Sequence, residues 1–409
     1  MKDRIMENTF ELEITDVAFG GNGLGRKDGF VYFVPGTLPG ELILAEETSR
    51  KKNFGTARLV EILRSSQNRI PPVCPLACSP CKNNKSAPGC HRCPGCSYQH
   101  VKYEEEILIK NRHLENFISH NLKIDPATVT DTPVPSPSNS NYRNKIVLHF
   151  SGTKLGYFAE DNTSVIDVEN CPIAKNEINA GLSEVRKDLK KFSHASELTL
   201  RYTEKNGVQH WIDNRASTGT LEEETAFGTL EVPRKGFFQI NLKCADLLAA
   251  EAVGIIKGLK VESLVDLYCG CGFFSMAACG SGIPGVYAAD SDSESVSSAI
   301  INAARLGFEK SCRFYAKSAE AFLADNTKKI GRDDSVLLLD PPRGGVSPKL
   351  RNLLIASGFR KLIYISCAPD TMARDMKLFC ECGYVLKKAR LFDMFPRTSH
   401  FETIAYLEK

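Results

Sequence analysis

Five short apolar runs, separated by longer segments of mixed polarity, dominate the chain from residue 236 to its end. They read SLVDLYC, GVYAAD, CRFYAK, SVLLLD and KLIYIS. Strands of a parallel sheet are buried on both faces, so they consist of nearly continuous apolar residues, and a helix usually connects each strand to the next. The alternation therefore predicts a doubly wound α/β domain, in which ligands bind at the carboxyl ends of the strands.

The preceding residues follow other patterns. Between residues 8 and 64, apolar and polar positions alternate in FELEITDVAF, GFVYFVP and ELILAEET, which predicts a small β-barrel. Between residues 132 and 233, strand-like runs and turn signals such as Asn206-Gly207 predict a central α+β domain. We expect the barrel to span residues 1–66, the central domain 67–235, and the Rossmann-like α/β domain 236–409.

The first apolar run ends in Asp266 and leads into a loop with Gly270 and Gly272, where the backbone can pass close to a ligand. Asp290 ends the second run, and a carboxylate there can accept hydrogen bonds from both ribose hydroxyls of a nucleoside. A dinucleotide site would need a third glycine against the pyrophosphate, but Ser275 occupies that position. The pattern favours S-adenosylmethionine over a dinucleotide, with a merely structural glycine turn as the alternative.

Cys367 follows the fifth run in YISCAPDTMARD, so it stands at the carboxyl end of a predicted strand. Most buried cysteines are inert small hydrophobic residues, which is the simplest interpretation of any single one. The fourth run, however, leads into Asp340-Pro341-Pro342-Arg343 at the same sheet edge, and an arginine can stabilise a thiolate. This position makes Cys367 a candidate nucleophile.

Three late segments, LDPPRGGV, YISCAPDTMARD and DMFPRTSHFETI, closely resemble motifs of the RNA (uracil-5-)methyltransferase family. GFFQIN and VDLYCGCGFF resemble its cofactor motifs, and ENCPIA and CPGCSYQH resemble the cysteine segments of its cluster-bearing members. The N-terminal FGGNGLGRKDGFVYFVPGTLPGE is similar to a TRAM domain, an OB-like RNA-binding barrel. The resemblance extends in order over almost the whole chain. It implies methylation of carbon 5 of a uridine in RNA with S-adenosylmethionine.

The resemblance also implies roles for individual residues. Cys367 would add to carbon 6 of the uracil ring, and Glu402 would remove the carbon 5 proton after methyl transfer. Arg343 would orient the base. In isolation, a strand-end cap would be the better interpretation of Asp340, and a solvated surface acid that of Glu402; only their combination favours catalytic roles. Ala368, after the nucleophile, departs from the Asn of many relatives. The implied cofactor contacts are Gln239, Tyr268, Gly270, Asp290 and Asp340.

The chain has 15 cysteines, and six of them lie between Cys74 and Cys96. Because the cytosol keeps thiols reduced, such clustering indicates metal or redox chemistry rather than structural disulfides. By resemblance, Cys93, Cys96 and Cys171 are three ligands of a [4Fe–4S] cluster. We expect Cys74 to be the fourth ligand, with Cys90 as the alternative. A separate zinc site is a further alternative, formed by Cys74, Cys78, Cys81 and Cys90.

The formal net charge is only +3, so RNA binding has to depend on local basic patches. Two stretches are candidates for such basic patches, although each could also be an ordinary solvated face. One runs from residue 50 to residue 69 with Glu61 as its single acid, and its bases are Arg50, Lys51, Lys52, Arg58, Arg64 and Arg69. The other runs from residue 82 to residue 100 without an acid, and contains Lys82, Lys85 and Arg92.

Relatives that act on transfer RNA commonly lack both the TRAM segment and the cluster, which favours 23S ribosomal RNA as the substrate. Transfer RNA is one alternative. An inactive relative that binds RNA or senses redox state is the other, but it would be expected to lack Cys367 or Glu402, and both are present. The sequence shows no signal peptide or membrane-spanning run, so we expect a cytoplasmic protein without an obligate protein partner.

Overall fold

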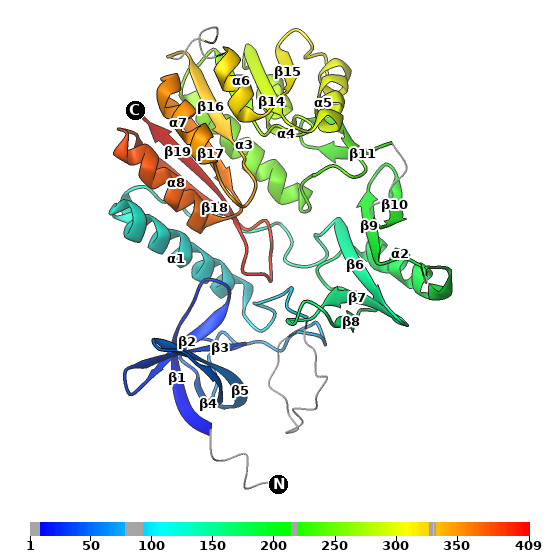
Figure 1. Ribbon diagram of the computed structural model, residues 1–409, viewed down its shortest axis with the longest axis vertical. Helices are drawn as coiled ribbons and strands as arrows, with labels where there is room; N and C mark the ends of the chain where they lie inside the picture. Colours follow the sequence, from blue (N-terminus) through cyan, green and yellow to red (C-terminus); the bar gives the residue numbers. More distant parts are fainter. Residues whose placement is uncertain (1–8, 78–92, 193, 214–218, 327–329, 331–332) are drawn as a thin grey trace.

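The computed structural model describes residues 9–77, 93–192, 194–213, 219–326, 330 and 333–409. A barrel lies at one end of the molecule, the largest sheet lies at the other end among its helices, and a smaller sheet projects to one side (Figure 1). Within these residues, no helix is long and apolar enough to cross a membrane.

The N-terminal strands form a closed barrel in the order β1-β2-β3-β5-β4. Alternate side chains point inward, and Leu12, Ile14 and Val34 are almost completely buried there. Gly25 has no room for a side chain, because a Cβ atom would lie 2.4 Å from the carbonyl oxygen of Glu13. The barrel expected from the alternating pattern is confirmed. Its strands are β1 (Thr9–Val17), β2 (Asn22–Lys27), β3 (Phe30–Pro35), β4 (Leu42–Arg50) and β5 (Phe54–Arg64).

The central sheet has the strand order β10-β9-β6-β7-β8, and α2 packs against it through Ile178 and Leu182. The predicted turn at Asn206-Gly207 joins β9 to β10, and Gly207 has the positive φ of 63° that such a turn requires. The elements are β6 (Lys145–Ser151), β7 (Lys154–Phe158), β8 (Val165–Asp167), α2 (Asn176–Arg186), η2 (Leu189–Phe192), β9 (Glu197–Thr203) and β10 (Gly207–Ile212), followed by the hairpin β11 (Thr220–Thr225) and β12 (Gly228–Pro233).

The C-terminal sheet has the strand order β15-β14-β13-β16-β17-β19-β18. The five apolar runs form its parallel strands, and helices cover both faces, so the predicted doubly wound fold is confirmed (Figure 1). The strands are β13 (Ser263–Leu267), β14 (Gly285–Asp290), β15 (Cys312–Ala316), β16 (Ser335–Leu339), β17 (Lys361–Ser366), β18 (Val385–Phe392) and β19 (Glu402–Glu408). The helices are α3 (Leu242–Gly258), α4 (Phe273–Gly280), α5 (Ser293–Arg305), α6 (Ala319–Asn326), α7 (Pro348–Ser357) and α8 (Pro369–Glu381).

Two features of this sheet determine where a site can form. The direction of strand succession reverses between β13 and β16, and doubly wound sheets bind ligands at such a switch point. In addition, β19 runs antiparallel to β17, so β19 begins at the edge where β17 ends. One edge of the sheet therefore contains the carboxyl ends of β13, β16 and β17 together with the start of β19.

Helix α1 (Tyr103–Leu122) comes from residues expected in the central domain, but it packs against α8 and β18 of the C-terminal domain. Its Leu114 and Ile118 belong to the hydrophobic core of that domain. After η1 (Pro126–Thr128), Val134 forms a β-bridge with Phe392 on the edge strand β18. In Figure 1, α1 lies between the barrel and the large sheet, so it connects the two ends of the molecule.

Candidate active site

A pocket opens at the switch point of the C-terminal sheet, beside the loop between β13 and α4. Tyr268, Gly270 and Gly272 have positive φ values of 69°, 52° and 87°, so the backbone bends sharply around the pocket. A tyrosine in this region of φ is strained, and such strain is concentrated at functional sites. The pocket is lined by residues that include Phe237, Gln239, Tyr268, Gly270, Phe273 and Asp340.

Asp290 ends β14 directly beside this loop. Its Oδ2 accepts a 2.9 Å hydrogen bond from the N–H of Gly270, and its Oδ1 accepts a 2.8 Å hydrogen bond from the N–H of Asp292. Each carboxylate oxygen can accept a second hydrogen bond. Asp290 is thus held at the position where a nucleoside ribose lies in this topology.

Ser275, where a dinucleotide site would need glycine, has a structural role. Its hydroxyl donates a 2.6 Å hydrogen bond to Oδ2 of Asp266, and both residues are completely buried. Burial raises the pKa of Asp266 to about 7, although the bond from Ser275 opposes the shift. A glycine could not supply this hydroxyl, and loss of a hydrogen bond to a buried carboxyl would be destabilising.

Cys367, Arg343 and Glu402 meet at the same sheet edge. Cys367 directly follows β17, Arg343 lies shortly after β16, and Glu402 is the first residue of β19. Because Ser366 pairs with Thr403 across antiparallel β17 and β19, the next residues, Cys367 and Glu402, are neighbours. The structure therefore brings together the three residues that the family motifs place in the reaction.

The surroundings of Cys367 and Glu402 favour the neutral form of both side chains, whereas Arg343 beside them stays positively charged. Burial raises the pKa of the Cys367 thiol to about 11 and Glu402 adds to the shift, whereas Arg343 lowers it by its charge and a hydrogen bond. Glu402 is only 7% exposed, and burial together with Asp340 raises its pKa well above the usual value. Its Oε2 has no hydrogen-bond partner among the described residues, so this atom is available to accept a proton.

Asp340 connects this group to the pocket. It lines the pocket, and its charge raises the pKa values of both Cys367 and Glu402. Burial and the nearby Asp266 raise the pKa of Asp340 itself to about 7. A ligand in the pocket and a ring bound to Cys367 would therefore be neighbours, as a group transfer between them requires.

A second pocket is lined by three of the clustered cysteines, Cys74, Cys93 and Cys96, together with the distant Cys171. Burial raises the pKa of Cys93 to about 11 and that of Cys96 to about 12, and the charge of Cys171 contributes to both shifts. Nevertheless, among the residues described, no three His, Cys, Asp or Glu side chains are arranged to hold a metal ion. The iron–sulfur centre expected from the sequence is therefore not shown by the structure.

The basic stretch from residue 50 to residue 69 carries less free charge than its sequence indicates. Acids of the barrel form ion pairs with four arginines of this stretch: Arg50 with Glu47 on the same strand, Arg58 with Glu46, Arg64 with Glu13, and Arg69 with Glu41. The other basic stretch (Lys82, Lys85 and Arg92) and the further cysteines Cys78, Cys81 and Cys90 lie outside the described residues.

Sequence reasoning did not single out Phe237, which lines the pocket although 76% of it is exposed. The available signal was the pair Phe237-Phe238 in GFFQIN. Adjacent residues of an extended segment point to opposite sides, so only one of the two rings can enter the core. Phe238 is the buried one, and Phe237 is left at the mouth of the pocket.

Comparisons with known proteins identify the family. Residues 226–409 match the family model described as tRNA (Uracil-5-)-methyltransferase. The chain is also 32% identical to an uncharacterized RNA methyltransferase of Bdellovibrio bacteriovorus, with 99% of this chain and 96% of the relative covered. The chain belongs to the RNA (uracil-5-)methyltransferase family.

A further relative and a solved structure match the chain over almost its whole length. The 23S rRNA (uracil(1939)-C(5))-methyltransferase RlmD of Stenotrophomonas maltophilia is 28% identical, with 100% of this chain and 99% of the relative covered. The fold is similar to that of a Pyrococcus abyssi tRNA (uracil-54, C5)-methyltransferase solved with S-adenosyl-L-homocysteine. The TM-score is 0.73 at 20% identity, over 97% of this chain and 100% of that one.

Proposed function

We propose that this methyltransferase methylates carbon 5 of a uridine in RNA with Cys367 as a covalent nucleophile and Glu402 as the base. The observation that supports this proposal is the adjacency of Cys367, Glu402 and Arg343 across β17 and β19, next to a pocket that shares Asp340 with them. A methyltransferase that acted directly on its substrate would not need a thiol at this place.

Each of these residues has a task in the reaction. Carbon 5 of uracil is too weak a nucleophile to take a methyl group from a sulfonium directly. Addition of the Cys367 thiolate to carbon 6 forms an S–C bond and moves the ring's double-bond electrons toward carbon 5, giving an enolate. Bound S-adenosylmethionine would supply the methyl group to carbon 5, with its S–CH3 bond broken and S-adenosylhomocysteine as the leaving group. Glu402 then takes the carbon 5 proton, the ring double bond re-forms, and the S–C bond breaks to return the thiolate. Arg343 stabilises the thiolate and orients the uracil ring.

The residues proposed to hold S-adenosylmethionine are those that surround the pocket at the switch point. Asp290 would accept the ribose hydroxyls, and Gly270 would let the backbone approach the ligand. Aromatic and amide side chains provide the remaining polar and apolar contacts. The full proposed set is Gln239, Tyr268, Gly270, Asp290 and Asp340.

We propose 23S ribosomal RNA as the substrate, with the target uridine flipped out of its stack to reach Cys367. The full-length relative from Stenotrophomonas maltophilia, named for 23S rRNA, and the N-terminal barrel support this choice. Transfer RNA is the alternative substrate, because the names of the family model and of the Pyrococcus abyssi enzyme both specify tRNA. In our proposal, the barrel at residues 1–66 is a TRAM domain that binds RNA with the central domain at 67–235, and 236–409 is catalytic.

We also propose that Cys74, Cys93, Cys96 and Cys171 hold a [4Fe–4S] cluster. Support comes from the fit of the donors: four thiols from three separate parts of the chain line one pocket, and four thiolates suit such a cluster. They suit zinc equally well, so metal analysis has to separate the two. The proposed methyl transfer needs no electron transfer, and the cluster would serve to fasten the segment around Cys93 to the central sheet.

The test of the proposed function uses cluster-loaded protein, S-adenosylmethionine and RNA that contains 5-fluorouridine, analysed on a denaturing gel. Fluorine cannot leave as a proton, so the covalent protein–RNA adduct should persist. Cys367→Ala should abolish the adduct, whereas Cys382→Ala, at the far end of α8, should leave it unchanged.

The two classes of RNA are compared in parallel, so the experiment also identifies the substrate. Preferential adduct formation with ribosomal RNA supports the proposal, and preference for transfer RNA would favour the alternative substrate. Folded wild-type protein that forms no adduct with either RNA would refute the covalent mechanism and favour an inactive RNA-binding relative.

A further inference from the structure

We propose that five residues, Tyr103, Glu106, Lys110, Asp393 and Arg397, form an anchor that positions Glu402 for proton removal. The first three lie in α1, and the other two lie in the segment that leads from β18 to β19 and ends at Glu402. The inference rests on the proposed function, because it assigns these residues to the step in which Glu402 acts. None of the five is a catalytic residue; they are positioning residues.

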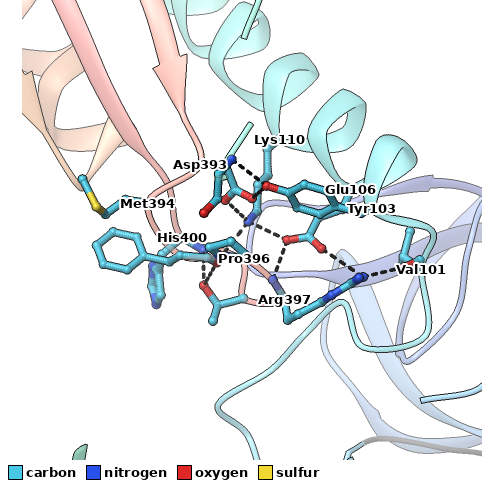
Figure 2. A network of polar contacts seen from close by, with 12 residues as sticks. Val101, Tyr103, Glu106, Lys110, Asp393, Met394, Pro396, Arg397 and His400 are labelled. Carbon is cyan, nitrogen blue, oxygen red and sulfur yellow. Dashed lines mark hydrogen bonds and ion pairs between the residues drawn. The ribbon is translucent and has the colours of Figure 1, made fainter. Parts of the chain in front are cut away.

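Lys110 is the centre of the anchor (Figure 2). Its Nζ donates hydrogen bonds of 2.8 Å to Oε1 of Glu106, 2.7 Å to Oδ1 of Asp393 and 3.2 Å to the carbonyl oxygen of Phe395. The side chains of Lys110, Glu106 and Asp393 are fully buried. All three donor positions of the ammonium are used, and two of them hold the segment before Glu402.

Tyr103 and Arg397 extend the anchor on both sides of Lys110. The Tyr103 hydroxyl donates a 2.8 Å hydrogen bond to Oδ2 of Asp393. The backbone N–H of Arg397 donates a 2.7 Å hydrogen bond to Oε1 of Glu106, and its guanidinium donates one of 2.8 Å to the carbonyl oxygen of Val101. Figure 2 shows these side chains pointing toward one another between α1 and the C-terminal segment.

The segment between the anchor and Glu402 is held in place by hydrogen bonds within itself. The carbonyl oxygen of Phe395, already bonded to Lys110, also accepts a 2.8 Å hydrogen bond from the Thr398 hydroxyl, which accepts one from the N–H of His400. Burial and the positive charges of Arg343 and Lys110 lower the pKa of His400. His400 therefore lies between the anchor and the reactive group, two residues before Glu402.

The backbone at Arg397 shows that the surroundings impose this conformation. Arg397 has a φ of 69°, which is unfavourable for a residue with a side chain. Its carbonyl oxygen accepts a 2.9 Å hydrogen bond from the N–H of Tyr98, in the segment that follows Cys96. Such conformations persist only where neighbouring groups over-determine them, and they are concentrated at functional sites.

Stability alone does not explain a fully buried lysine between two acids. Well-packed apolar residues would stabilise the contact between α1 and β18 at least as well, because they need no desolvation of charge. Directional hydrogen bonds offer what apolar contacts cannot: they fix the carbonyl and carboxylate groups of one segment at defined places. The segment so fixed carries Glu402, whose proton transfer depends on geometry.

The experiment measures release of the methylated RNA separately from methyl transfer. RNA with ordinary uridine is incubated with each variant and S-adenosylmethionine, and both the gel-stable adduct and the free methylated product are followed in single turnover. Wild type should show little adduct. Lys110→Met and Asp393→Asn should transfer the methyl group but release the product about 10- to 100-fold more slowly, so methylated adduct accumulates. Glu402→Gln serves as the reference for complete loss of the base.

Glu251→Gln is the matched control. It also alters a largely buried carboxylate with ion-pair partners, Lys388 and Arg390 on β18, but these partners lie outside the segment that ends at Glu402. Binding of S-adenosylmethionine and the melting temperature are measured for every variant. Tyr103→Phe, which removes only one hydroxyl, replaces Lys110→Met if that variant does not fold, and it should show a smaller accumulation of adduct.

The anchor is supported if adduct accumulates in the anchor variants but not in Glu251→Gln, and if the affinity for S-adenosylmethionine is unchanged. The proposed anchor is overturned if folded anchor variants release product as fast as wild type does. It is also overturned if they lose methyl transfer and product release in equal proportion. If wild type forms no adduct with 5-fluorouridine RNA, or Glu402→Gln releases product normally, the proposed function fails first, and this outcome is distinct from failure of the anchor alone.

Discussion

Burial determines the protonation states of the proposed nucleophile and the proposed base. Cys367 and Glu402 both have raised pKa values, so near neutral pH the thiol and the carboxylic acid are the main forms. A nucleophile and a base must each lose a proton before they act. Arg343 is the group that favours both ionised forms.

The thiol predicts how adduct formation depends on pH. Because the pKa of Cys367 is raised to about 11, the thiolate fraction increases as the pH rises toward that value. The rate of adduct formation with 5-fluorouridine RNA should therefore rise roughly tenfold per pH unit between about pH 6 and pH 7.5. Single-turnover rates plotted against pH provide the measurement. A rate that does not change over this range would mean that RNA binding already ionises the thiol.

Arg343→Met should slow adduct formation. Without the guanidinium, the pKa of Cys367 rises further, and the thiolate fraction at a given pH falls. We expect a reduction of about tenfold or more at pH 7, partly reversed at higher pH. Arg313→Met, in the exposed part of β15, is the control. An equal loss at every pH would indicate that Arg343 acts only in orienting the base.

At the scale of elements, the loop after β13 and the hairpin of β18 and β19 place the two halves of the site. The loop positions Gly270 against Asp290, and the antiparallel direction of β19 places Glu402 beside Cys367. A parallel strand at the same position would have put Glu402 at the opposite edge of the sheet, far from the thiol.

Asp290→Ala tests the loop. The substitution removes the acceptor for the Gly270 N–H and the proposed acceptor for the ribose hydroxyls. We expect the Kd for S-adenosylmethionine to increase about 10- to 100-fold, measured by isothermal titration calorimetry. Asp161→Ala, an exposed acid between β7 and β8, should leave the Kd unchanged. Unchanged binding in Asp290→Ala would place the cofactor elsewhere.

At the scale of the whole molecule, the N-terminal half and the catalytic domain are not independent units. Helix α1 packs on the large sheet, and the segment after Cys96 bonds to Arg397 in the C-terminal segment. The pocket of four cysteines is therefore linked through the backbone to the residues before Glu402.

The proposed cluster predicts a specific pattern of metal loss. Serine at Cys74, Cys93, Cys96 or Cys171 should lower iron and sulfide content sharply, because each thiolate would hold one corner of the cluster. Serine at Cys380, in α8, should leave both unchanged. Chemical assays of iron, sulfide and zinc provide the measurement. Full iron content in Cys171→Ser would exclude the proposed set of four ligands. Stoichiometric zinc in the wild-type protein would instead indicate a zinc site formed by these cysteines.

Local patterns were sufficient for the parallel strands and the barrel of this chain. The apolar runs predicted the parallel strands, and the alternation between residues 8 and 64 predicted the barrel, because the burial of a strand is encoded by residues close in sequence. The segments around Gly270, Asp340, Cys367 and Glu402 similarly indicated a methyltransferase of the uracil family. These signals depend on residue type and spacing, which the sequence contains directly.

Contacts between distant segments were decided only by the tertiary structure. No sequence pattern indicated that Lys110 pairs with Asp393, or that Glu13 and Glu41 neutralise arginines of the basic stretch. It also could not show that α1 leaves the central domain to pack on β18. The physical reason is that local periodicity determines which face of an element is buried, whereas strand order, strand direction and packing determine which distant residues share that buried space.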